Sequence, residues 1–102
     1  MKIIKKLYTM IEEELKDAEK YIMCALKYKE DDLELSKVFY QLSMEEMDHM
    51  RRLHEAVVAK IEAYRREKGE PPAAMLSVYE YLHGRQTEES TEIKIMQAEY
   101  RS

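Results

Sequence analysis

The chain has 102 residues, the size of one small domain. Charged residues make up 37% of it, with both signs interspersed and a formal net charge of −4. It therefore lacks the basic patch that binds nucleic acid. No apolar run is long enough to cross a bilayer, and the first residues lack the apolar core of a signal peptide. Cys24 is the single cysteine, which fits a reducing compartment. We expect a cytoplasmic protein that binds neither nucleic acid nor membrane.

The first predicted element is a helix over residues 2–29. Its apolar residues recur at spacings of three and four, which is the period of a helix with one buried face. They are Ile4, Leu7, Tyr8, Ile11, Leu15, Ala18, Ile22, Ala25 and Leu26. A short polar link over 29–32 follows, and so short a link predicts an antiparallel hairpin with the next helix.

The second predicted helix covers residues 32–68. Asp31 is placed to cap it, with Glu34 three residues on as in a capping box. Gly69 is a natural end. The predicted inward stripe is Leu35, Val38, Phe39, Leu42, Glu46, His49, Leu53, Ala56, Val57 and Tyr64. This stripe contains a carboxylate and an imidazole, side chains that are rarely buried without a partner.

The third predicted element is a helical segment over residues 72–101. Pro71 and Pro72 separate it from the preceding helix. Its apolar face is Met75, Val78, Tyr79 and Leu82, and it resumes with Ile93, Met96 and Tyr100. Gly84 weakens the pattern, so one helix and two pieces both fit. The whole chain, 1–102, is predicted to be one all-α domain, a helical hairpin with a C-terminal helical segment.

Glu46 and His49 form an E-x-x-H step, which places both side chains on neighbouring turns of one helix face. At about 100° per residue, His49 lies about 20° and Glu46 about 40° from the stripe centre at Leu42. Glu14 lies roughly 60° from the centre of the first helix's stripe. It is the acidic residue of that helix best placed to face inward.

These three residues also share one level along the predicted hairpin. Glu14 comes 17 residues before Asp31, whereas Glu46 and His49 follow it by 15 and 18. At 1.5 Å per residue, all three lie roughly 25 Å from the turn. The sequence therefore predicts a metal site made by Glu14, Glu46 and His49, which would be both the metal ligands and the catalytic residues.

One histidine with carboxylates suits iron, manganese or zinc. The three residues make half of a known di-metal pattern, in which two helices each give a glutamate and two others each give Glu-x-x-His. A two-fold dimer would bring a second copy opposite the first and complete a four-helix bundle. We therefore expect a homo-oligomer, dimeric or larger, with two metal ions at each shared site.

The stretch ELKDAEKY, residues 14–21, and the stretch LSMEEMDHM, residues 42–50, resemble the first two metal helices of rubrerythrins, in the ferritin-like superfamily. In size the chain is similar to the half-length encapsulated ferritins, whose di-iron site is completed between two subunits. The resemblance implies oxidation of Fe(II) or reduction of peroxide, with Tyr21 adjacent to the metal ligands. No encapsulin-targeting peptide is evident at the C-terminus, so the sequence does not support a place inside such a shell.

Other interpretations remain open. Glu80 and His83 repeat the E-x-x-H step, and we expect them to be a surface pair. A further ligand could come from Glu89, or from Glu92. The main alternative is a helical dimerisation or partner-docking module without catalytic metal, in which the Glu and His side chains set the register of the helices. A protein that stores metal or binds zinc without turnover is a third reading.

Overall fold

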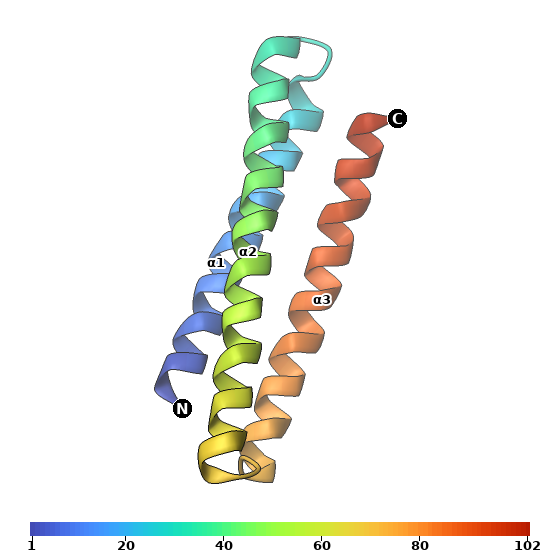
Figure 1. Ribbon diagram of the computed structural model, residues 1–102. Helices are drawn as coiled ribbons and strands as arrows, with labels where there is room; N and C mark the ends of the chain where they lie inside the picture. The colour runs from blue at the N-terminus through green and yellow to red at the C-terminus, as the bar shows by residue number, and fades with distance from the viewer.

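The computed structural model describes all residues 1–102 as three long helices without strands (Figure 1). They are α1 (Lys2–Tyr28), α2 (Leu33–Lys68) and α3 (Ala73–Arg101). These bounds lie within one residue of the predicted ones, and α3 is one continuous helix through Gly84. The helices lie side by side in a rod of 55 × 19 × 17 Å. None of them has an apolar stretch long enough to span a bilayer.

The ends of α2 are set by two residues with non-helical backbone. Asp32, rather than the predicted Asp31, caps the N-terminus, and its carboxylate accepts a hydrogen bond of 3.1 Å from the Leu35 N–H. Asp31 remains in the turn. At the other end Gly69 has φ +84°, which favours glycine, and its N–H donates to the Arg65 carbonyl.

The core is built mainly from α1. The buried residues of this helix recur every three or four positions, as predicted, and they are Ile4, Tyr8, Ile11, Leu15, Ala18, Ile22 and Ala25. They pack chiefly against α2. Each large aliphatic side chain removed from water in this way stabilises the fold by about 1.5–3 kcal/mol.

The face that α2 buries matches the prediction at Val57 but differs from it toward the turn. Its buried residues are Ser36, Ser43, Met47 and Val57. The predicted inward residues Leu35 and Val38 are instead 39% and 54% exposed. Serines are buried here because their small side chains allow the two helices to approach closely, and because their hydroxyls find acceptors on α1. Ser36 Oγ donates to the Ala25 carbonyl at 2.6 Å and Ser43 Oγ to the Ala18 carbonyl at 2.8 Å.

Helix α3 lies mainly along α1 and touches α2 much less. We call its buried hydrogen-bonded contacts with the hairpin the polar seam, made by Gln86, Gln97 and Tyr100 of α3. Gln86 Nε2 donates to the Tyr8 carbonyl and Gln97 Nε2 to Ser43 Oγ, both at 3.0 Å. The Tyr100 hydroxyl shares a hydrogen bond of 3.0 Å with Ser36. Helix α3 is therefore held by specific polar pairs as well as by apolar packing.

Candidate metal site

Glu14 of α1 and Glu46 and His49 of α2 meet at mid-height of the hairpin, and we call them the Glu–His cluster. One ligand atom from each lies within 4.8 Å of the others. His49 Nδ1 is 3.5 Å from Glu14 Oε2 and 3.7 Å from Glu46 Oε2. The three residues that the sequence places at one level are thus neighbours in space.

Their burial is less complete than the inward stripe predicted. The side chains of Glu46 and Glu14 are 18% and 26% exposed, whereas that of His49 is 51% exposed. The interior placement expected for His49 is therefore wrong within a single chain. The cause is the orientation of α2, which turns Ser43 and Met47 toward the core and leaves the predicted stripe at the flank of the hairpin.

The Glu–His cluster lies on a side of the hairpin that α3 does not cover. Glu12, two residues from Glu14, lies about 200° away around α1 and faces Glu89 of α3. Glu14 therefore lies on the opposite flank of the buried stripe. Met10, one turn before Glu14, and Val38, eleven residues before His49, share the flank of the cluster by helical spacing and are 39% and 54% exposed.

We call this uncovered flank the open face. Its exposed apolar residues, Ile3 and Met10 on α1 and Leu35 and Val38 on α2, surround the Glu–His cluster along the length of the hairpin. Leu35 and Val38 belong to the stripe that was predicted to face inward, whereas Ile3 and Met10 were not part of the predicted apolar face of the first helix. Elsewhere in the predicted stripe of α2, Phe39 and Leu53 pack against the core and Val57 is buried.

One atom of the cluster lacks a partner. Glu14 Oε2 is buried and accepts no hydrogen bond. A buried charged acceptor without a donor costs more than the about 1–3 kcal/mol of a neutral group. His49 Nδ1, at 3.5 Å, is too far for a good hydrogen bond. A cation between these side chains would satisfy the oxygen, so the donor set fits a metal ion.

The distances between the donor atoms of the Glu–His cluster also fit a metal ion. Carboxylate oxygens and imidazole nitrogens bind Zn²⁺ at about 2.0–2.2 Å, so two donors on one ion lie at most about 4.4 Å apart. The separations from His49 to the two carboxylates, 3.5 and 3.7 Å, are within that limit, and all three donor atoms lie within 4.8 Å of one another. Small side-chain rotations would suffice to bring Glu14, Glu46 and His49 onto one ion. The mixed oxygen and nitrogen set suits Fe(II), Mn(II) or Zn(II).

The residues considered as further ligands lie elsewhere. Glu89 is on the α3 side, where burial and the nearby Glu12 raise its pKa, and Arg85 is 3.8 Å away. Glu92 and Glu80 are exposed and outside the cluster. Tyr21 stacks on Phe39, with ring centroids 6.3 Å apart.

Glu80 and His83 are both exposed, as expected of a surface pair, but His83 also makes a contact that was not expected. Its ring stacks on that of His54 from α2, with centroids 4.8 Å apart. Sequence reasoning missed this contact. The available signal was that His54 falls seven residues after the buried Met47 and three before the buried Val57, on the same side of α2.

Searches for related proteins returned no match among protein-family models, curated proteins or solved structures. The class of protein is therefore argued from the site itself.

Proposed function

We propose that this chain is a di-iron, or di-manganese, carboxylate protein of ferritin-like type that oxidises Fe(II) or reduces peroxide. Glu14, Glu46 and His49 would bind the metal, together with the same three residues of a second copy. The buried Oε2 of Glu14 carries the proposal, because it accepts no hydrogen bond and lies beside two further donor atoms that could hold the same ion.

A second copy is proposed because the Glu–His cluster is incomplete in two ways. Three donors leave coordination positions open on iron or manganese, which favour about six. His49 is also half exposed, at the centre of an open face with exposed Met10 and Val38. A two-fold axis over this face would bury those apolar residues and bring a second set of donors opposite the first.

The ligand set suits oxidation of iron. A pair of iron ions can exchange two electrons, which is what the reduction of peroxide to water requires. Glu14 and Glu46 are hard anionic ligands, so they favour the more highly charged Fe(III) over Fe(II). His49 contributes a neutral nitrogen donor, and a glutamate from each copy could bridge the ions.

The test is elemental analysis of protein purified from cells grown with iron, together with the rate of Fe(II) oxidation in air. Glu46→Ala and His49→Ala should each lower the metal content at least about tenfold, because changing even the groups that orient ligands weakens binding about 10- to 100-fold. Oxidation should slow in parallel.

Glu45→Ala is the matched control, since Glu45 is an exposed glutamate next to Glu46. It should keep both the metal and the activity. Unchanged iron in both Glu46→Ala and His49→Ala would end the proposal, and so would equal losses in the Glu45 variant.

The alternative is a docking module in which the Glu–His cluster sets helix register without metal. The position of His49, within 3.5–3.7 Å of both carboxylates, supports it, because a protonated imidazole could pair with them directly. This reading predicts that chelator changes neither Tm nor association. Metal without turnover would instead indicate storage or simple zinc binding.

A further inference from the structure

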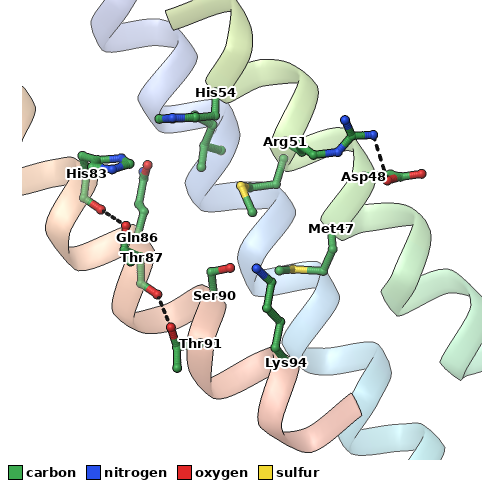
Figure 2. A pocket seen from close by; sticks show the side chains of 12 residues that line it. Met47, Asp48, Arg51, His54, His83, Gln86, Thr87, Ser90, Thr91 and Lys94 are labelled. Carbon is green, nitrogen blue, oxygen red and sulfur yellow. Dashed lines mark hydrogen bonds and ion pairs between the residues drawn. The ribbon is translucent and has the colours of Figure 1, made fainter. Parts of the chain in front are cut away.

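The contact between α2 and α3 has a gap in its middle. At one end Tyr100 stacks on Tyr40, with centroids 4.5 Å apart, and shares a hydrogen bond with Ser36. At the other end the short link 69–72 joins the two helices directly. Between these anchors lies a cavity of about 390 Å³, lined from both helices by polar side chains (Figure 2).

Two imidazoles bridge this gap. Figure 2 shows His54 of α2 and His83 of α3 side by side at one end of the cavity. Their centroids are 4.8 Å apart and their planes differ by 18°, so the rings are stacked. Both rings also line a second cavity of about 290 Å³, which extends toward Ile61 and Leu76. The histidine pair thus stands between two cavities that water could fill.

We propose that His54 and His83 form an acid-sensitive clasp, which holds α3 to α2 when both rings are neutral and releases this part of α3 when both are protonated. Neutral rings attract through stacking. Two imidazolium cations at this separation repel each other, and each would draw water into the adjoining cavities.

Nearby carboxylates offset this repulsion in part but do not reverse it, because the pKa of His54 is lowered despite Glu55. Helix α1 contributes only Tyr8 and Ile11 to the two cavities, and burial raises the pKa of Tyr8 so that it stays neutral. On α2, Arg51 is paired with Asp48 and Glu55, and Arg65 is paired with Glu62 and Glu70. Helix α3 contributes the carboxylate of Glu80, the ammonium group of Lys94 and the ring of Tyr79. Burial raises the pKa of Tyr79, so this ring stays neutral.

The direction of the pH effect follows from His54. Burial, and then the neighbouring His83, lower the pKa of His54, and Glu55 opposes this only in part. A histidine whose pKa is lower in the folded than in the unfolded state destabilises the fold when it gains a proton. The stability of the clasp is therefore present at neutral pH, and its loss begins as pH falls below the ordinary value of 6.5.

The experiment is amide hydrogen exchange on metal-free protein, at about pH 7.5 and about pH 5, above and below the ordinary histidine pKa. Rates are corrected for the intrinsic pH dependence of exchange. Protection over residues 79–90 should fall on acidification, in the direction set by the lowered pKa of His54. Residues 95–101, anchored by Tyr100, should change much less.

Three variants assign the response. The double variant His54→Phe with His83→Phe keeps two stacking rings that cannot be protonated, so its α3 should keep its protection at about pH 5. His49→Gln removes the remaining histidine of the chain and should respond like the wild type. A double variant that still loses protection, or an unchanged wild type, would overturn the clasp.

A measurement without variants guards against a double variant that fails to fold. In the wild type, the ring proton signals of His54 and the amide signals of residues 79–90 should shift over the same pH range in an NMR titration. Separate ranges would contradict the proposal. Because the protein is metal-free and the pair lies away from the open face, this outcome is independent of the proposed metal chemistry.

Discussion

Glu14 and Glu89 are both partly withdrawn from water, on opposite flanks of α1, and their surroundings differ. Glu14 faces His49 and Glu46, and its buried oxygen lacks a donor. Glu89 faces Glu12, with Glu19 also near, and burial and these carboxylates raise its pKa. The Glu14 oxygen lies beside donor atoms that fit a metal ion, whereas Glu89 is relieved of burial and repulsion by gaining a proton. Neutralising Glu89 should therefore stabilise the fold.

Glu89→Gln should stabilise the protein at neutral pH. Burial and Glu12 raise the pKa of Glu89 above its usual 4.5, so the fold favours the neutral form. Any stability from this group is present below about pH 4.5 and is lost as pH rises through the folded-state pKa. An uncharged glutamine should raise Tm at pH 7 by about 2–4 °C, which is what about 0.5 kcal/mol means in a domain of this size.

Thermal unfolding followed by circular dichroism measures this effect. Glu88→Gln is the matched control, because Glu88 is exposed and should change Tm little. The gain from Glu89→Gln should shrink as pH falls below 4.5. A gain that persists there would show that relief of charge is not the cause.

The two glycines of the chain test the helix boundaries. Gly84 lies inside α3, and a Cβ added there would meet no atom within 4 Å. Gly84→Ala should therefore raise the free energy of unfolding by about 0.5–1 kcal/mol, since alanine is the better helix former. Gly69 has φ +84°, and Gly69→Ala should lower it by about 1 kcal/mol or more. Urea unfolding measures the free energy of unfolding of both variants. A change of the same sign in the two variants would contradict the assigned helix boundaries.

The positions of the helices were predictable from the sequence because their ends are marked by backbone chemistry. Gly69 and the adjacent prolines end α2 and begin α3, and the uninterrupted spacing of Ile4, Ile11 and Ile22 defines the face of α1. Counting residues from the turn was enough to bring Glu14 and His49 to one level.

The orientation of α2 was not predictable in this way. Hydrophobic spacing selects apolar residues for the interior, but here Ser36 and Ser43 are fully buried. Their hydroxyls bind carbonyls of α1, and that compensation depends on a neighbouring helix which the periodicity of α2 does not contain. The His54–His83 contact was missed for the same reason, because it depends on where α3 lies.

For the molecule as a whole, the open face predicts association. Val38 lies on this face two turns before Glu46, whereas Val58 lies roughly 160° away from Val38 around α2. The two valines are similarly exposed, at 54% and 47%. Val38→Glu should raise the dissociation constant of the dimer at least about 100-fold, because an unpaired charge buried at an interface costs several kcal/mol.

Sedimentation analysis over a range of protein concentrations measures the constant. Val58→Glu is the matched control and should associate as the wild type does. Helical content should be the same in both variants, since neither side chain is packed in the core. Equal association of Val38→Glu and the wild type would rule out a dimer built on this face.

The polar seam has a consequence for how α3 is aligned. Apolar ridges tolerate small displacements, because one methyl group replaces another with little loss. The hydrogen bonds Gln86–Tyr8 and Gln97–Ser43, in contrast, can both form at only one position of α3 along the hairpin. A shift of α3 by one turn, about 5.4 Å, would leave each amide facing the wrong neighbour at once. A shift of α3 along its own axis would therefore break both hydrogen bonds together, so the polar seam fixes the register of α3 on the hairpin.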